Sequence, residues 1–187
     1  MSTTTNSETK KFASEIEAIR TQARRHVERG SVTEGYDADR AEVLALLDGA
    51  LATEIVCYLR YKHHHFAARG LNADIAATEF LEHATEELQH ADQIAGRIVQ
   101  LGGSPNLDPA SLVARSHADY IAGSSLEEMI RENLVAERIA IDAYRMMLQH
   151  LGEGDATTRN MLESILATEE EHADDMSRLL RSPRSSH

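Results

Sequence analysis

Apolar residues recur every three or four positions along most of the chain, which is the spacing of one face of an α-helix. Four long segments carry this pattern, at about residues 37–69, 74–101, 125–152 and 155–182. Glycines follow the first three segments, and Pro183 follows the fourth. Ser125 and Glu128 have the spacing of a capping box at the start of the third segment. The chain is therefore predicted to be all-α, with four long helices.

The connections between these segments predict the topology. Gly70 and the segment 152–154 mark short turns, which join helices into antiparallel hairpins. The connection from Gly102 to Ser124 is long enough to cross the length of a bundle, and Asp108-Pro109 predicts a short helix within it, through Val113 or Ala114. We therefore expect an antiparallel four-helix bundle with one long crossover.

The two ends of the chain are predicted to lie outside the bundle. Residues 1–9 are polar and predict a disordered tail, and an apolar stripe over residues 10–29 predicts a short accessory helix. Residues 1–36 are thus expected to form a tail and an accessory helix, residues 37–181 the bundle, and residues 182–187 a disordered C-terminal tail.

Each long helix carries one glutamate in the middle of its apolar stripe. The four are Glu54, Glu87, Glu137 and Glu169. A glutamate is almost never fully buried unless it is paired or coordinates a metal. Two of the four have a histidine three residues later, which places both side chains on one face of their helix. These histidines are His90 and His172.

The pattern repeats in the two halves of the chain. Glu54 and Glu87 are 33 positions apart, and Glu137 and Glu169 are 32 apart, which fits one ascent and one descent of a helical hairpin. Two glutamates and two Glu-x-x-His pairs on four helices are the ligand set of a carboxylate-bridged dimetal site. The alternative is a structural bundle in which these glutamates face water, but the repetition favours metal.

Carboxylates and imidazoles suit iron or manganese, and a thiolate ligand set is lacking. Four carboxylates can neutralise two divalent ions and favour their oxidation by O2 or H2O2. Zinc would bind without a redox role. We therefore expect two iron ions per subunit, with manganese as the alternative.

The composition limits the kinds of partner that the protein is expected to bind. A net charge of −12 argues against nucleic acid as the main partner and suits a protein that attracts cations. The single cysteine, Cys57, excludes an intrachain disulfide. The sequence has no apolar run of about 20 residues and no hydrophobic signal-peptide core, so we expect no membrane contact and a cytoplasmic location.

Over roughly residues 40–180 the sequence resembles the bacterioferritin and Dps-like branch of the ferritin superfamily. The likeness rests on Glu54, residues 87–92, Glu137 and residues 169–172. It implies that Glu54 and Glu137 are terminal ligands, that Glu87 and Glu169 bridge, and that each histidine binds one iron. It also implies ferroxidase activity and storage of ferric mineral in a hollow homo-oligomeric shell.

The resemblance bears on three further points. Tyr61, seven residues after Glu54, resembles a tyrosine beside family di-iron sites, and an ordinary core tyrosine is the alternative. Leu88 stands where bacterioferritins have the haem-binding methionine, so haem is not expected. The short helix in the crossover, with no fifth helix after residue 181, favours a 12-subunit shell over a 24-subunit one.

Two rival functions stay open. One is another dimetal enzyme, such as a manganese catalase or a small oxygenase. The other is a Dps-type protein that protects DNA, where contact would fall to the basic residues of the N-terminal segment. These residues are Lys10, Lys11, Arg20, Arg24, Arg25 and Arg29. Four acidic residues lie among these six, which leaves a net charge of only +2. The run His63-His64-His65 is expected to be a solvated or interface patch rather than a metal site.

Overall fold

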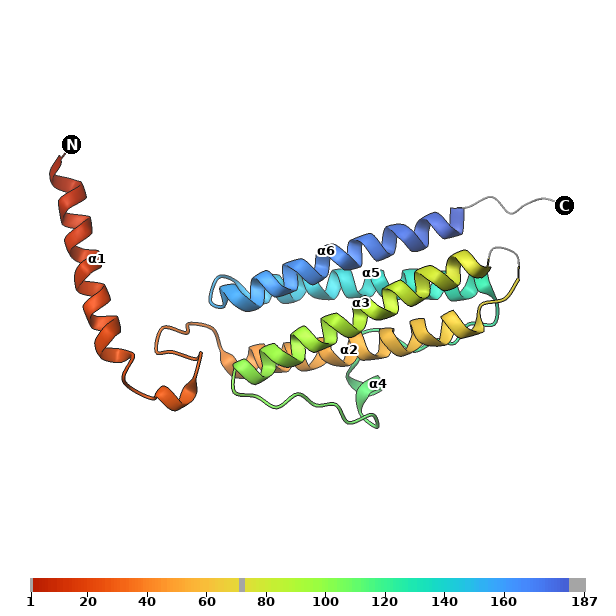
Figure 1. Ribbon diagram of the computed structural model, residues 1–187, viewed down its shortest axis with the longest axis horizontal. Coiled ribbons are helices and arrows are strands. Elements are labelled where there is room, and N and C mark those ends of the chain that lie inside the picture. Colours follow the sequence, from red (N-terminus) through yellow and green to blue (C-terminus); the bar gives the residue numbers. More distant parts are fainter. Residues whose placement is uncertain (1, 71–72, 182–187) are drawn as a thin grey trace.

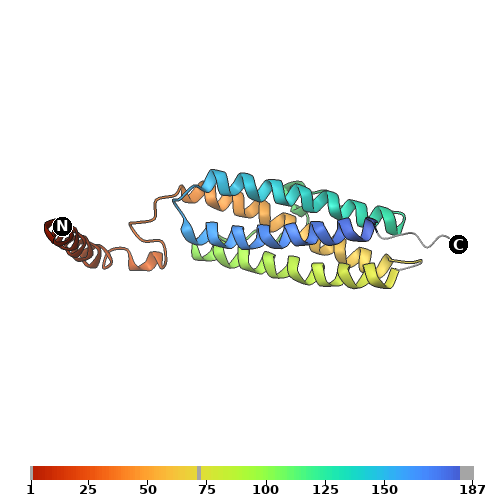
Figure 2. The same cartoon turned by 90° about the horizontal axis from the view of Figure 1, so that it is seen from above.

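The computed structural model describes residues 2–70 and 73–181, and it confirms the predicted bundle. Its four long helices are α2 (Arg40–Ala67), α3 (Ala73–Gln100), α5 (Leu126–Leu151) and α6 (Ala156–Arg181). Helix α2 packs along α3 and α5 along α6, and the two hairpins meet through the pairs α2–α5 and α3–α6 (Figures 1 and 2). Across the described ranges, no helix combines the length and the apolar character that a membrane span requires.

The starts of the helices follow the local sequence. Asp39 caps α2, because its Oδ1 accepts hydrogen bonds from the amides of Ala41 at 2.9 Å and Glu42 at 3.2 Å. Ser125 caps α5 by accepting from the Glu128 amide at 3.2 Å, as predicted. The Glu128 carboxylate accepts from the amide of Ser124 at 2.7 Å. Both side chains of the motif therefore fix the entry of the chain into α5.

The long crossover runs along the outside of α2 (Figure 1). Its short helix α4 (Leu112–Arg115) buries Leu112 against Ala52 and Val56. The prediction that Asp108 caps this helix and that Pro109 lies in its first turn was wrong. Asp108 instead closes a turn by accepting from the amide of Ala110 at 3.0 Å, and the helix begins three residues after Pro109.

Buried polar side chains of α2 hold the end of the crossover in place. Arg60 is fully buried and donates to the carbonyl of Asp119 at 3.2 Å. His64 is also fully buried, and its Nε2 lies 3.0 Å from the carbonyl oxygen of Ile121. The prediction of a solvated or interface patch at residues 63–65 was therefore wrong for His64, which satisfies backbone groups of the crossover.

The apolar core is divided into two clusters along the bundle. One cluster includes Leu47, Leu51, Ile94, Leu162 and Ile165. The other includes Tyr61, Phe80, Ala84, Ile130 and Met176. On each of the four long helices, the buried residues of the two clusters lie on opposite sides of the predicted metal-ligating glutamate along the chain. A polar layer therefore separates two apolar ends of one core.

The N-terminal segment differs from its prediction. Helix α1 (Ser2–Gln22) begins before the predicted position and ends earlier, followed by the short 3-10 helix η1 (Val27–Arg29). Residues 2–9, expected as a disordered tail, are helical because no glycine or proline lies between Ser2 and Gln22 to interrupt the helix. Helix α1 projects away from the bundle (Figure 1). Its apolar side chains Phe12 and Ile19 are exposed. The expected C-terminal tail, residues 182–187, lies outside the described residues.

Candidate metal centre

The polar layer brings together all six residues that the sequence predicts as metal ligands. Helix α2 supplies one, α5 supplies one, and α3 and α6 each supply a Glu-x-x-His pair, so the side chains enter from four directions. All are buried, with at most 5% of each residue exposed: Glu54, Glu87, His90, Glu137, Glu169 and His172. The structure therefore places them in one enclosed site.

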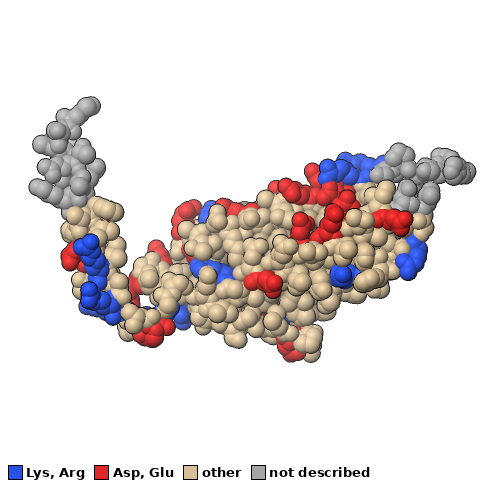
Figure 3. All heavy atoms as spheres, viewed as in Figure 1, with Lys and Arg blue, Asp and Glu red and all other residues tan. Residues whose placement is uncertain are grey.

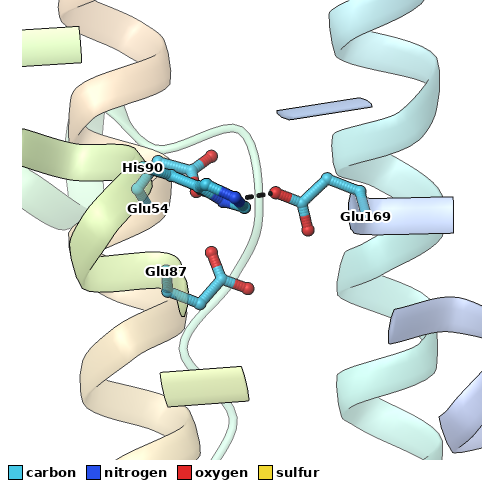
Figure 4. A group of neighbouring side chains, drawn as sticks. All are labelled: Glu54, Glu87, His90 and Glu169. Atoms are coloured by element: carbon cyan, nitrogen blue, oxygen red, sulfur yellow. Dashed lines mark hydrogen bonds and ion pairs between the residues drawn. The ribbon is translucent and has the colours of Figure 1, made fainter. Parts of the chain in front are cut away.

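The six side chains form two overlapping groups of possible ligands. The first group is Glu54, Glu87, His90 and Glu169, which Figure 4 shows converging from three helices. The second group is Glu87, Glu137, Glu169 and His172. Within each group the ligand atoms lie within 4.8 Å of one another. Glu87 and Glu169 belong to both groups, so each carboxylate is placed to contact two ions at once.

The histidines direct the same nitrogen at the carboxylates. His90 Nδ1 lies 3.2 Å from an oxygen of Glu54 and 3.1 Å from one of Glu169. His172 Nδ1 lies 3.4 Å from an oxygen of Glu169 and 3.7 Å from one of Glu87. Each Nδ1 is thus one vertex of a nitrogen–oxygen cage.

Several of these polar atoms have no hydrogen bond to satisfy them. Within the described part of the chain, the buried side-chain atoms without a hydrogen-bond partner are both oxygens of Glu87, both oxygens of Glu169, Oε2 of Glu137 and Nδ1 of His172. An unsatisfied buried polar atom costs about 1–3 kcal/mol, and more when it is charged. Cations between these atoms would satisfy all of them, so the residues fit a pair of metal ions.

Burial shifts the protonation of these groups. Burial, with repulsion from Glu169 and Glu54, raises the pKa of Glu87 well above its usual value. Burial and the charge of Glu169 raise the pKa of Glu137 to about 8. The pKa of Glu169 falls to about 2, because the close contacts with His172 and His90 outweigh the effect of burial. Carboxylate neighbours likewise outweigh burial at the histidines and raise the pKa of His90 to about 10 and that of His172 to about 9. Without metal ions, protons therefore neutralise the site.

Two tyrosines hold the glutamates that belong to only one group. Tyr61 of α2 donates its hydroxyl hydrogen bond to Glu137 of α5. Tyr144 of α5 donates in the same way to Glu54 of α2. Burial, followed by the nearby glutamates, raises the pKa of both phenols well above 10, so both keep their proton. From the sequence, Tyr61 was singled out and Tyr144 was not, although each tyrosine lies seven residues after the glutamate of its own helix.

Two further polar residues beside His172 were missed. Glu86 accepts from the Nε2 of His172 at 2.7 Å, which holds the Nε2 proton and leaves Nδ1 as the nitrogen that can bind a metal ion once its own proton has left. His83 stacks on His172, with 3.9 Å between ring centroids. Burial and the neighbouring His172 lower the pKa of His83 to about 3, so its ring is neutral. The available signal was position, because Glu86 precedes Glu87 directly and His83 lies one turn before it.

Comparison with known proteins agrees with this geometry. A model of the ferritin family, described as the ferritin-like domain, matches residues 44–185. A bacterioferritin of Rhodobacter capsulatus is 30% identical over 138 residues, which cover 72% of this chain and 80% of that protein. A DNA protection during starvation protein of Brevibacillus brevis is 29% identical over 133 residues, covering 70% of this chain and 89% of that protein. A dodecameric thioferritin, the bacterioferritin-related protein of Bacteroides fragilis, superimposes with a TM-score of 0.74 and 32% identity, covering 77% of this chain and 87% of that one. The chain belongs to the ferritin-like family, in its bacterioferritin and Dps-like branch.

Proposed function

We propose that this protein stores and detoxifies iron. Two Fe(II) ions bind as substrate between the six buried residues, and O2 or H2O2 oxidises them. The observation that carries the proposal is one buried layer of four carboxylates and two imidazoles, with six ligand atoms that make no hydrogen bond. The site forms within a single chain, and each half of the layer offers three carboxylates and one histidine.

In the proposed arrangement, Glu87 and Glu169 bridge the two ions. Glu54 and His90 complete one site, and Glu137 and His172 complete the other. Four carboxylates balance two divalent ions, and they stabilise the higher charge once each iron has lost an electron. Two Fe(II) release two electrons, which with two protons reduce one H2O2 to two waters or one O2 to H2O2.

The surrounding residues exclude water from the site and hold its terminal glutamates in position. The two apolar clusters exclude water from both ends of the layer, which strengthens electrostatic interactions inside it. Tyr61 and Tyr144 hold the terminal glutamates in place through their hydroxyls. Protons that occupy the layer without metal leave as Fe(II) binds.

We further propose that the ferric product is stored in a hollow homo-oligomeric shell of 12 subunits. The match to a dodecameric thioferritin over most of both chains supports this assembly. Large apolar side chains exposed on the bundle also support burial between subunits. Examples are Phe66, Val99, Val135 and Met146.

A direct test adds Fe(II) without oxygen to metal-free protein, then O2 or H2O2, and follows the absorbance of the ferric product. We expect saturation near two irons per chain, rapid oxidation and then slower mineral growth. The variant Glu169→Gln should lose the rapid phase, while Glu82→Gln, an exposed residue of α3, should keep it. Oxidation no faster than in buffer would remove the ferroxidase function, and manganese with peroxide would then be tested as the alternative substrate pair. Light scattering gives the subunit number.

A second candidate function is DNA protection, because relatives carry that name and α1 projects from the bundle. The charges of this segment weaken the case. Lys11 pairs with Glu15 at 3.9 Å, Arg20 with Glu17 at 3.0 Å, and Arg29 with Glu34 at 3.5 Å. A salt-sensitive gel shift that disappears on deletion of residues 1–30 would establish DNA binding, and no shift at low salt would remove it.

A further inference from the structure

A second cluster of metal-ligating side chains lies one helical turn from the six-residue centre. Glu79 and His83 project from α3, and Asp175 projects from α6. One ligand atom of each residue lies within 4.8 Å of those of the other two. None of the three belongs to the six-residue centre, and the proposed iron chemistry uses none of them.

The hydrogen bonds around His83 fix which of its nitrogens carries the proton. The Tyr61 hydroxyl donates its only proton in the hydrogen bond to Glu137, so its oxygen can act only as an acceptor toward His83. His83 Nδ1 lies 3.2 Å from that oxygen and must therefore be the donor. Nε2 is then the ring nitrogen that is left to offer a lone pair to a metal ion. This lone pair lies on the side of the carboxylates, so a buried acceptor faces two more acceptors.

The distances around this lone pair suit a cation. His83 Nε2 lies 3.5 Å from Oδ2 of Asp175 and 3.8 Å from Oε2 of Glu79. Atoms bound about 2.1 Å from one ion lie roughly 3–3.5 Å from one another, so small adjustments bring all three into contact with it. Arg178 holds the other oxygen of Asp175, which leaves Oδ2 directed at His83.

The exposure of the three side chains allows an ion to reach the cluster from solvent. The side chain of His83 is only 3% exposed, whereas those of Glu79 and Asp175 are 33% and 27% exposed. An ion can therefore arrive from solvent at the carboxylates, bind the buried nitrogen and keep water ligands on its outer side. Acidic residues gather over α3 and α6 on the face shown in Figure 3.

The matching positions of the other hairpin show that the fold does not need this cluster. Counted from the glutamate of each Glu-x-x-His pair, Glu79, His83 and Asp175 correspond to Met161, Ile165 and Gln93. Ile165 is a core residue, 1% exposed. His83 thus lies with two carboxylates at a position where the related helix has an apolar core residue. Folding alone does not explain a histidine at this position.

We propose that Glu79, His83 and Asp175 form a third divalent-cation site, separate from the six-residue centre and open to solvent. The mixed nitrogen and carboxylate ligands suit Fe(II) and similar ions such as Co(II) or Mn(II). His83 stacks on His172, and Tyr61 links His83 to Glu137, so an ion here lies next to the dimetal centre. The site holds Fe(II) before it enters that centre. This transit role depends on the proposed ferroxidase function, whereas the binding of an ion does not.

The first experiment measures binding alone. Co(II) is the probe, because its binding can be measured without any oxidation of the metal. Equilibrium dialysis compares the full chain with the double variant Glu79→Gln/Asp175→Asn. The control is Glu82→Gln/Asp174→Asn, which removes two exposed carboxylates from the same two helices. We expect the first variant to bind one ion fewer per chain than the wild type, and the control to bind as many as the wild type. Equal binding by all three proteins, or an equal loss in both variants, would overturn the site.

A second experiment locates the ion and tests its role. Crystals soaked in Co(II) should show an anomalous peak between His83 Nε2 and the two carboxylates, and a peak only in the six-residue centre would reject the proposal. In stopped-flow oxidation at less than two Fe(II) per chain, Glu79→Gln/Asp175→Asn should be slowed about tenfold or more relative to the control variant. Binding of the third Co(II) with unchanged iron kinetics would keep the site and reject its transit role. No rapid oxidation in the wild type would instead reject the ferroxidase function and leave the binding result standing.

Discussion

The hydroxyl of Tyr144 in α5 donates a hydrogen bond to Glu54 of α2, and the hydroxyl of Tyr61 in α2 donates a matching one to Glu137 of α5. Each hairpin thus supplies the tyrosine that orients a glutamate of the other. This exchange links the two halves of the bundle through the candidate ligands themselves, so the position of one half sets the ligand geometry of the other.

The tyrosine exchange predicts that Tyr144→Phe weakens metal binding. Loss of an outer hydrogen bond to a metal ligand typically costs about 10–100-fold in affinity, and we expect a similar loss for one of the two ions. Tyr61→Phe should do the same at the other ion. Titration with Co(II) measures both affinities. Tyr58→Phe, a half-buried tyrosine of α2, is the control, and the prediction is wrong if all three variants bind alike.

The hydrogen bond from His172 to Glu86 predicts a selective effect. Glu86→Ala removes the acceptor that keeps the Nε2 proton away from the ligand nitrogen, so His172 should lose its fixed tautomer. We expect one ion to bind about tenfold or more weakly while the other keeps its affinity. Calorimetric titration with Zn(II) separates the two steps, and Glu82→Ala is the matched control. An equal weakening of both ions would contradict this role.

The pKa of Glu87 predicts the outcome of an isosteric substitution. Burial and neighbouring carboxylates raise this pKa well above its usual value, so metal-free protein favours the protonated form of the side chain. Glu87→Gln has nearly the same shape and charge as that form. Denaturant unfolding should therefore give metal-free wild type and variant free energies within about 1 kcal/mol of each other. Added Zn(II) should stabilise only the wild type, and equal stabilisation of both would exclude Glu87 as a ligand.

The stability of the metal-free protein should fall as the pH rises. The pKa values of Glu137, His172 and His90 are raised to about 8, 9 and 10, so the folded protein binds more protons than the unfolded chain in this range. Their contribution is complete below the unfolded pKa values and is lost on the way to the folded ones. The pKa of Glu169 is lowered to about 2, so its contribution disappears in acid instead.

The contribution of Glu137 is lost as the pH rises above its unfolded pKa of 4.5, and that of Glu169 is lost as the pH falls below the same value. Together these shifts place the greatest stability of the metal-free protein at about pH 4.5. Thermal unfolding from about pH 3 to about pH 9 measures this curve. With Zn(II) bound, the ions displace the protons, so the loss of stability above pH 6 should disappear. A metal-free protein that becomes more stable between pH 6 and 8 would contradict the protonation of the site.

Much of the fold could be predicted from the sequence, because helices of this length carry a strong periodic signal. The four bundle helices and the long crossover are confirmed, with bounds within a few residues. The ligand role of the six residues stays a prediction, although the structure brings them together. Repetition made them visible, since buried charges at matching depths in two hairpins need a common cause.

The remaining features depend on contacts that no local pattern specifies. His83 and Glu86 gain their roles only when α6 brings His172 against α3. His64 became a core residue because the crossover folds over α2 and presents the Ile121 carbonyl to it. The extent of α1 was wrong for another reason: among its described side chains, residues 11–22, none is buried, so no buried stripe marks the limits of the helix.

The division of the core into two apolar clusters has a consequence for how the molecule unfolds. Protons are a weak substitute for divalent ions in the layer between the clusters, because they neutralise charge without joining the four helices. Without metal, the two ends of the bundle should therefore exchange their amide hydrogens as separate units, with different opening free energies. With metal bound, they should exchange as one unit. The bound metal ions would therefore determine whether the bundle unfolds as one cooperative unit or as two.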